Sequence, residues 1–388
     1  MLRKLFRKTP LAWNQVTREK TRLAIAIAGI GFADILMFVQ LGFMEAFYKS
    51  AVLPHENMDA DLVLVSPNLE TLFVVKSFTR NRIYQAAAVE GVKSTSSLYV
   101  DTAYWRNPDT GINRPILVYG IDPAKPAFKL PEIKQQIPQI QILNRVLYDR
   151  AGRPEYGDIP QLFQQSSSLS AQLNDLNVQV AGLFTIGASF AADGNVIASD
   201  STFLHLFPKR QPDQIDVGII HIKQNADIKQ VQANLQATLP KDVDVLTLAE
   251  FAEREKTYWG NSTPIGFVFG FGTIIGFIVG MVIVYQILYS DVSDHLPEYA
   301  TLKAMGYSDG YLVGVLIQEA IVLGLLGFIP GFAVSAGLYY IAKTATLLPI
   351  VMNFNRAIMV LLLTLIMCGG SGFIAMRKLQ AADPADVF

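Results

Sequence analysis

Four long apolar stretches dominate the hydrophobic pattern of the chain. They run over residues 23–47, 265–289, 311–341 and 357–376. A bilayer core about 30 Å thick needs about 20 mostly apolar helical residues, so each stretch is long enough to cross it. The pattern therefore predicts four transmembrane helices.

The polar segment between the first two stretches, residues 48–264, is long enough to form a domain of its own. Its apolar residues alternate or recur at helical spacing in two β-α-β patterns, one near each end. These patterns predict strands at 59–67, 93–100, 215–222 and 243–248, with helices at 83–91 and 226–239. We expect an α+β domain with a ferredoxin-like, porter-like lobe from about 50–100 and 200–250. Residues of about 101–199, with strands near 115–120 and 178–184, are expected to form an inserted lobe.

The orientation follows from the basic residues of the short flanking segments, because Lys and Arg are retained on the cytoplasmic side. Residues 1–22 carry seven basic residues and a single acid, Glu19. We expect this segment, the loop 290–310 and the tail 377–388 to be cytoplasmic. The domain 48–264 and the loop 342–356 are then periplasmic. The first apolar stretch is too long for a cleavable signal peptide and has no A-x-A-like site after it, so we interpret it as a signal anchor.

The composition agrees with a membrane protein and excludes several other classes. Charged residues make up 17%, hydrophobic residues make up 51%, and the mean hydropathy is +0.31. The net charge of −1 leaves no broad cationic surface for nucleic acid. Cys368 is the single cysteine, which excludes an intrachain disulfide.

No pattern of catalytic or metal-binding residues is present in the sequence. The histidines of the polar segment, His55, His205 and His221, are too widely spaced for a helical metal site. No Walker A sequence occurs, so the chain cannot bind ATP by that route. We therefore expect no cofactor in this chain and no enzyme activity of the chain alone.

Glycine recurs every four residues in the second apolar stretch, at Gly272, Gly276 and Gly280. Residues spaced in this way lie on one helix face, and glycine there lets two helix backbones approach closely. The spacing favours a close helix contact, within the chain or between subunits. The alternative is that glycine is simply common in membrane helices.

Polar side chains interrupt two apolar stretches, with Asp34 midway along the first and Gln318 and Glu319 in the third. A charged carboxylate at that depth costs about 2.5 kcal/mol or more, so we expect these groups to face protein or water. They form either a proton relay or structural hydrogen bonds. We favour structural bonds, because no basic residue stands at a comparable depth.

The loop 290–310 contains the signals of a short helix. Asp294 is a suitable cap, Pro297 suits the first turn, and Gly306 suits the end. Apolar residues recur at helical spacing on one side, at Tyr299, Leu302 and Met305. Such a helix can lie on the membrane or fit a groove of another protein.

The sequence EYATLKAMGYS at residues 298–308 follows the second apolar stretch, and ADPA lies at residues 382–385. Together with the order of one span, a large polar domain and three spans, these motifs resemble the FtsX-like permeases of MacB-type, or type VII, ABC transporters. The sequences at 60–66 and 119–123 are most similar to the cyanobacterial DevC branch.

This resemblance implies a homodimer in the inner membrane that works with a separate, DevA-like ATPase subunit carrying ATP and Mg²⁺. It further implies a DevB-like periplasmic fusion protein, a TolC-like outer-membrane channel, and export of glycolipid for the heterocyst envelope. ATP-driven motion passes through the helices to the periplasm, and lipid surrounds the spans. The residues expected at the ATPase contact are Glu298, Tyr299, Leu302, Lys303, Met305 and Gly306.

One departure from the family pattern concerns the residues before Glu298. The family often has a basic residue there, whereas this chain has His295, Leu296 and Pro297. Three other functions stay open: a non-transporting regulator of a periplasmic enzyme, a lipoprotein-releasing permease and a proton-coupled carrier. The carrier is the least favoured, because four helices without an inverted repeat make a poor alternating-access core.

Overall fold

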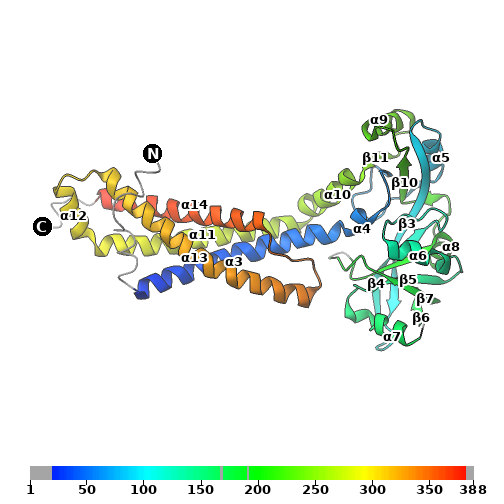
Figure 1. The fold of residues 1–388 in the computed structure, drawn as a ribbon, viewed down its shortest axis with the longest axis horizontal. Helices are drawn as coiled ribbons and strands as arrows, with labels where there is room; N and C mark the ends of the chain where they lie inside the picture. The colour runs from blue at the N-terminus through cyan, green and yellow to red at the C-terminus, as the bar shows by residue number, and fades with distance from the viewer. Residues whose placement is uncertain (1–19, 167–168, 190–191, 382–388) are drawn as a thin grey trace. The chain divides into compact units, whose positions relative to one another are not determined.

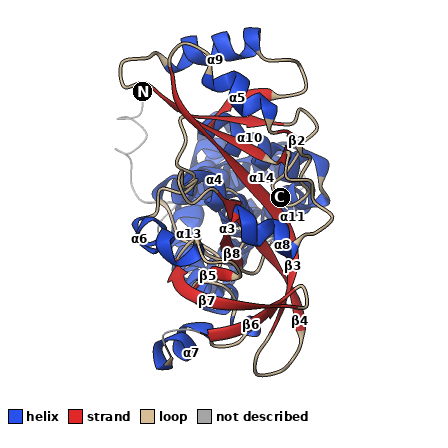
Figure 2. Cartoon of the chain, turned by 90° about the vertical axis from the view of Figure 1, so that its right-hand side faces the viewer, coloured by secondary structure: helices blue, strands red, loops and turns tan. Residues whose placement is uncertain are grey.

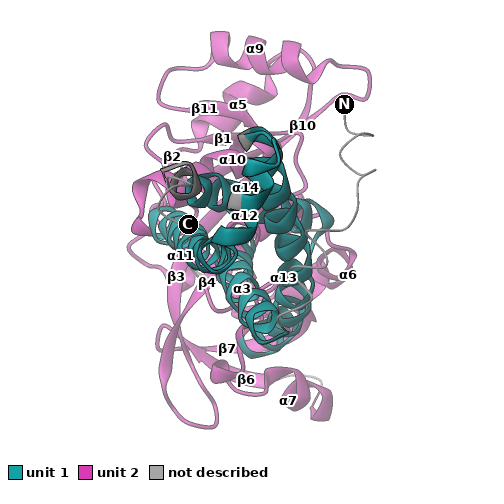
Figure 3. Cartoon of the chain, turned by 90° about the vertical axis from the view of Figure 1, so that its left-hand side faces the viewer, with its two compact units in different colours: residues 1–46, 265–345, 350–388 teal, residues 47–264, 346–349 magenta. Residues whose placement is uncertain are grey.

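The computed structural model describes residues 20–166, 169–189 and 192–381, and the chain folds into two units (Figure 3). The membrane unit comprises the described residues up to Ala46, residues 265–345 and the described residues from 350 onward. The sheet unit comprises residues 47–264 and 346–349. Most of the predicted cytoplasmic segment 1–22 and the ADPA motif at 382–385 lie outside the described residues.

Four long helices, each able to span a membrane by length and hydropathy, form the membrane unit (Figure 1). They are α3 (Lys20–Ala51), α11 (Pro264–Asp294), α13 (Asp309–Thr346) and α14 (Phe354–Ala381), with the short helix α12 (Leu296–Ala304) between α11 and α13. Together with the sheet unit they confirm the predicted fold class, an α-helical membrane protein with an α+β domain. Each helix extends beyond its apolar stretch, because helical hydrogen bonding continues into the polar flanks until a local stop signal ends it.

Side chains from all four long helices form one apolar cluster inside the membrane unit. The cluster includes Ala26, Ile30 and Ala33 of α3, Val284 and Leu288 of α11, Leu316 and Ala320 of α13, and Met367 and Ala375 of α14. The four helices therefore form a packed bundle within one chain.

The sheet unit combines strands with short helices (Figure 2). Its strands are β1 (Leu62–Val65), β2 (Phe78–Thr79), β3 (Val92–Arg106), β4 (Asn113–Ile121), β5 (Arg145–Asp149), β6 (Leu169–Leu173), β7 (Leu176–Phe184), β8 (Asn195–Ser199), β9 (Gln214–Ile215), β10 (Val217–Ile222) and β11 (Asp244–Thr247). Its helices are α4 (Leu53–Asn57), α5 (Asn81–Ala87), α6 (Pro131–Ile140), η1 (Pro154–Tyr156), α7 (Ile159–Gln165), α8 (Asp200–Leu206), α9 (Ile228–Thr238), α10 (Leu248–Thr257) and the π-helical turn η2 (Tyr258–Ser262).

Both predicted β-α-β patterns are present, as β1-α5-β3 and β10-α9-β11. Their strands interleave in the order β11-β1-β10-β3, and every neighbouring pair is antiparallel. This interleaving is the split β-α-β arrangement of ferredoxin-like folds.

Strand β3 joins this lobe to the rest of the sheet (Figure 2). Its first half pairs with β10, and its 15 residues are long enough to continue into a second set of pairings with β4. The sheet then runs on through β8, β5, β7 and β6, and β6 returns to pair with the end of β3 at Trp105 and Arg106. The expected inserted lobe is therefore continuous with the first lobe through one shared strand.

The central strands are buried on both faces, which explains their continuous apolar runs. In β1, Leu62 and Leu64 belong to one apolar cluster, and Val63 and Val65 belong to another. Helices α5, α8 and α9 contribute to the first cluster, and α6 and α10 contribute to the second. The sheet thus lies between two layers that contain helices.

A buried aspartate at the end of β5 fixes two loops of this lobe. The Asp149 carboxylate accepts hydrogen bonds from the backbone N–H groups of Ala151, Ile186 and Gly187, and from Nδ2 of Asn195 at 2.8 Å. Burial raises the pKa of Asp149, and these hydrogen bonds oppose the rise. A raised pKa means that the folded chain holds this proton more tightly than the unfolded chain. The contribution of Asp149 to stability is therefore largest at low pH and falls as the pH rises.

We expect Asp149→Asn to lower the free energy of unfolding of the sheet unit by about 1 to 3 kcal/mol, because an amide NH₂ would face backbone N–H donors that now meet an acceptor. The measurement is the thermal unfolding midpoint of the detergent-solubilised chain. Asp158→Asn is the matched control, since Asp158 is the N-cap of α7 and Asn caps a helix equally well. Equal midpoints for the two variants would contradict the assigned role of Asp149.

Candidate functional site

The loop between α11 and α13 forms the predicted short helix, α12. Pro297 lies in its first turn. At its end Gly306 has a φ of +91°, which glycine adopts without steric cost. The Gly306 N–H donates to the Lys303 carbonyl at 3.0 Å, and the Tyr307 N–H donates to the Leu302 carbonyl at 3.2 Å. This pair of bonds is a Schellman motif, and it stops the helix at a defined residue.

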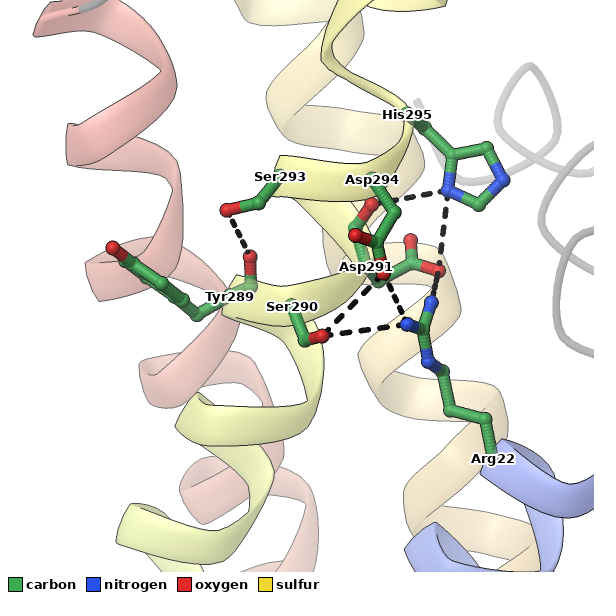
Figure 4. A network of polar contacts seen from close by, with 7 residues as sticks. All are labelled: Arg22, Tyr289, Ser290, Asp291, Ser293, Asp294 and His295. Atoms are coloured by element: carbon green, nitrogen blue, oxygen red, sulfur yellow. Dashed lines mark hydrogen bonds and ion pairs between the residues drawn. The ribbon is translucent and has the colours of Figure 1, made fainter.

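The start of α12 differs from the sequence prediction. The N-cap is His295, without a side-chain capping bond, and Asp294 is the last residue of α11. The Asp294 carboxylate instead pairs with Arg22 in the first turn of α3 (Figure 4). A carboxylate paired with Arg22 at the end of α11 is not placed to cap α12, which accounts for the difference.

Arg22 is the centre of a polar network at this end of the bundle (Figure 4). Besides Asp294, its guanidinium donates to Asp291 Oδ1 at 3.2 Å and to Ser290 Oγ at 3.3 Å. The Nδ1 atom of His295 lies 3.5 Å from Asp291 Oδ1. The network fixes the start of α3 to the end of α11, directly before α12.

The predicted contact residues of α12 differ in exposure. Met305 is 64% exposed and Glu298 is exposed, whereas Leu302 is half-buried and packs against the apolar cluster of the membrane unit. Lys303 is half-buried, and the side chain of Tyr299 lies outside the described residues. The expected single apolar face is therefore divided: Leu302 contacts its own bundle, and Met305 is available to a partner.

The three predicted glycines of α11 all contact α3, and Gly280 also contacts Met367 of α14. A Cβ atom at Gly276 would lie 3.2 Å from the Leu36 Cβ, and one at Gly280 would lie 2.6 Å from the Ala33 Cβ. At Gly272 it would lie 2.5 Å from the Gln40 Cδ. No side chain larger than hydrogen fits at Gly280 without displacing a neighbour.

A second close contact, between α3 and α13, was missed by the sequence analysis. A Cβ at Gly31 would lie 3.3 Å from the Gly327 carbonyl oxygen, and one at Gly331 would lie 3.1 Å from the Gly31 carbonyl oxygen. The spacing of Gly327 and Gly331 is itself a G-x-x-x-G signal that could have been read from the sequence.

The intramembrane carboxyl group of Asp34 is fully buried and lies 2.5 Å from the Thr364 hydroxyl. That hydroxyl also lies 2.8 Å from the Val360 carbonyl oxygen. The Thr364 hydroxyl has one proton, which it donates to the Asp34 carboxyl oxygen or to the Val360 carbonyl oxygen. This geometry is that of a structural hydrogen bond between α3 and α14.

Gln318 and Glu319 lie elsewhere in the bundle. Glu319 is buried, with an Oε2 atom that has no hydrogen-bond partner among the described residues, and Gln318 is half-buried. The Asp34 side chain contacts α13 at Gly331, which is 12 residues beyond Glu319, or about 18 Å along a helix. The two carboxyl groups therefore do not form a continuous proton path.

A further ion pair, not predicted, joins α3 to the start of α14. The Arg356 guanidinium is 2.5 Å from Glu45 Oε2, and the guanidinium carbon lies 5.2 Å from the centre of the Tyr339 ring. Asn353 also donates to Glu45, at 2.8 Å. The sequence gives little indication of the Arg356–Glu45 ion pair, because a lone Arg beside an apolar stretch usually marks a membrane boundary.

The described residues contain no group of three His, Cys, Asp or Glu side chains able to hold a metal ion. The Arg22, Asp34 and Arg356 contacts pair helices of the membrane unit with one another, and Met305 at the end of α12 is exposed.

Four helices able to span a membrane form a single packed bundle, and one α+β unit is inserted after the first, as in a multi-pass membrane protein. Residues 267–384, which cover most of the last three spans, match the FtsX-like permease C-terminal domain.

Two solved structures are similar to the chain. One is the periplasmic region of MacB from Actinobacillus actinomycetemcomitans, with 10% identity, a TM-score of 0.35, and coverage of 50% of this chain and 90% of that one. The other is the extracellular domain of the noncanonic ABC-type transporter YknZ from Gram-positive bacteria, with 14% identity, a TM-score of 0.33, and coverage of 48% and 99%. The comparison with curated proteins gave no significant match.

We expect Gly276→Leu to separate α11 from α3 and to lower the free energy of unfolding of the membrane unit by about 1 to 3 kcal/mol, as overpacking does. Gly270→Leu is the matched control in the same helix, because a Cβ there meets nothing within 4 Å. The measurement is the thermal unfolding midpoint in detergent, together with disulfide trapping of cysteines placed on the two helices. A Gly276→Leu variant as stable as the control would show that this glycine face has no packing role.

We expect Asp34→Asn to fold and function like the parent, because Asn keeps the shape and its amide oxygen can accept from the Thr364 hydroxyl, but Asn cannot titrate. Asp34→Leu, which removes the hydrogen bond, is expected to lower stability. The measurements are the unfolding midpoint and the activity of the assembled transporter across pH. Loss of activity in a folded, assembled Asp34→Asn protein would instead support a proton relay.

Proposed function

We propose that this chain is the permease subunit of a MacB-like ABC exporter, driven by a separate ATPase subunit that binds ATP and Mg²⁺. The observation that carries the proposal is α12, a helix with an exposed Met305 that follows directly on the Arg22 network. A subunit without an ATP-binding motif of its own requires contact with a motor protein, and α12 offers an apolar anchor, Met305, at its end and the exposed Glu298 in its first turn.

Motion at α12 has a direct route into the bundle. The covalent link to α11 transmits it first, and the Arg22 ion pairs couple the end of α11 to α3. The glycine contacts then hold α3 and α11 close together, because glycine faces leave no gap that could absorb a sideways displacement. We infer that ATP-driven closure moves α3 and α11 as a pair and so acts on the periplasmic domain by mechanotransmission.

The proposed assembly is a homodimer with a periplasmic fusion protein and a TolC-like outer-membrane channel, the DevA-, DevB- and TolC-like partners implied by the sequence motifs. Helix α11 has an exposed apolar stripe, Phe267, Phe271, Ile274, Ile278 and Val282, which lipid or a second copy of the chain would cover. A lipid such as glycolipid is the proposed substrate, as in the DevC branch that residues 60–66 and 119–123 resemble. Amino and carboxyl termini are proposed to be cytoplasmic, and the sheet unit is proposed to be periplasmic.

The assembly is tested by affinity purification of the full-length chain from its native membrane, with identification of the proteins that copurify. An ATPase with a fusion protein supports an exporter. An ATPase with a periplasmic hydrolase and no fusion protein would instead indicate a regulator, and the absence of any ATPase would contradict the proposal.

We expect Met305→Asp to release or uncouple the ATPase, because a charge in a buried contact is left desolvated and costs several kcal/mol. Lys303→Gln, at the polar edge, is expected to weaken binding only slightly. The measurement is the amount of copurified ATPase and its hydrolysis rate in the same membranes.

Ile112→Asp, an equal change at a residue of the sheet unit that is 57% exposed, serves as the control. If Met305→Asp retains the ATPase as fully as Ile112→Asp does, α12 is not the contact.

A further inference from the structure

A buried carboxylate in the sheet unit receives hydrogen bonds from two other parts of that unit. Glu255 of α10 is 1% exposed. Its Oε1 atom accepts from the Thr71 hydroxyl at 2.5 Å and from the Trp259 indole Nε1 at 2.7 Å. Its Oε2 atom accepts from the Leu72 backbone N–H at 3.0 Å. Glu255 therefore ties α10 to the turn after β1 and to the π-helical turn η2.

A histidine faces the same carboxylate without bonding to it. His55 of α4 is fully buried, and its Nε2 atom lies 3.5 Å from Glu255 Oε2. Neither ring nitrogen has a hydrogen-bond partner among the described residues. Hydrogen bonds of this kind form at about 2.7 to 3.2 Å, so a shift of about 0.5 Å would close the contact. A buried ring with two unpaired nitrogens is costly, and a nearby state in which one of them is bonded is correspondingly favoured.

Aromatic rings enclose the indole that completes this cluster. The Trp259 ring packs edge-on against Phe47 at 5.3 Å and against Phe73 at 6.3 Å. The His55 ring packs edge-on against Phe251 at 4.4 Å. The rings exclude water from the carboxylate, so a small change in the His55–Glu255 distance has a large electrostatic effect.

The cluster is built from segments that adjoin the first two spans in the sequence. Helix α4 comes directly after α3, and η2 comes directly before α11, so the cluster contains residues from both segments that connect these spans to the sheet unit. The third member, the turn with Thr71 and Leu72, follows strand β1 of the sheet. Turn η2 is a π-helical turn, a form that is frequent at functional sites.

We propose that His55, Glu255 and Trp259 form a two-state polar clamp, in which displacement of α4 relative to α10 closes the His55–Glu255 contact and passes movement to the sheet through Thr71 and Leu72. Glu255 and His55 are positioning residues in this view. The inference rests on the proposed function, since the ATPase subunit supplies the displacement.

The hydrogen bond from Trp259 to Glu255 provides a spectroscopic signal of the clamp. The chain contains three tryptophans, so 5-fluorotryptophan labelling gives three ¹⁹F signals, and Trp259→Phe identifies the one from Trp259. The full-length chain with its copurified ATPase, in nanodiscs, is compared without nucleotide and with a non-hydrolysable ATP analogue. We expect the Trp259 signal to shift on addition of the analogue.

His55→Phe separates clamping from packing, because Phe keeps the edge-on ring contact with Phe251 and removes the two unpaired nitrogens. It is expected to unfold at the parental temperature or above and to lose the nucleotide-dependent shift. Glu255→Gln is expected to lose that shift as well. His205→Phe, at an exposed histidine of the same unit, is the matched control and is expected to keep it.

The possible outcomes distinguish this inference from the proposed function. If ATPase binds and hydrolyses ATP while the Trp259 signal stays constant, the clamp is overturned and the proposed function stands. If His55→Phe shifts like the parent, His55 has no part in coupling and the two-state clamp is likewise overturned. If no ATPase copurifies, both proposals fail together.

Discussion

Close backbone contact along α3 is the constraint on which the rest of the membrane unit depends. Lipid tails are as apolar as leucine, so burial alone does not drive membrane helices together, and close packing must do so. Gly31 of α3 lies against Gly327 and Gly331 of α13. On another side of α3, Leu36 lies against Gly276 of α11. Because α3 is in close contact with both neighbours at these positions, a sideways displacement of either helix would press on it. The first span, α3, is therefore the helix that both of these close contacts share.

Polar groups complete this arrangement by fixing register. Arg22 pairs the start of α3 with the end of α11, Asp34 bonds α3 to α14, and Glu45 pairs α3 with Arg356 of α14. Each polar group near lipid is costly unless it has a partner, so a helix slid by one turn would leave several of them unpaired. Glycine contacts alone permit sliding along the helix axis, whereas these pairs define one position. Close packing and polar pairing therefore have different roles in the same bundle.

The sequence predicted the elements that have a strong local signal. The four spans, both β-α-β patterns and the Gly306 stop of α12 were all visible as apolar length, periodicity or turn chemistry. It did not predict the pairing of β3 with β6 or the partner of Asp294, because these contacts join residues distant in the chain. The sequence also did not show that Leu302 packs inward while Met305 is exposed. Helical spacing predicts which residues share a face of the helix, but it does not predict which of them another helix covers. Pairing between distant residues, unlike hydrophobic periodicity, has no signal in the local sequence.

Glu255 illustrates why such an unpredicted contact can matter for function. Packing alone does not explain a carboxylate here, because an apolar residue would fill the space as well, although it would leave the buried Thr71, Leu72 and Trp259 donors without an acceptor. What a carboxylate provides instead is directionality: it holds Trp259, Thr71 and the Leu72 N–H in one geometry and leaves a fourth direction open toward His55. An apolar contact weakens gradually as its members slide, whereas a hydrogen bond is either made or broken over a fraction of an ångström. A junction that must pass small displacements between helices and a sheet is better served by the second kind of contact.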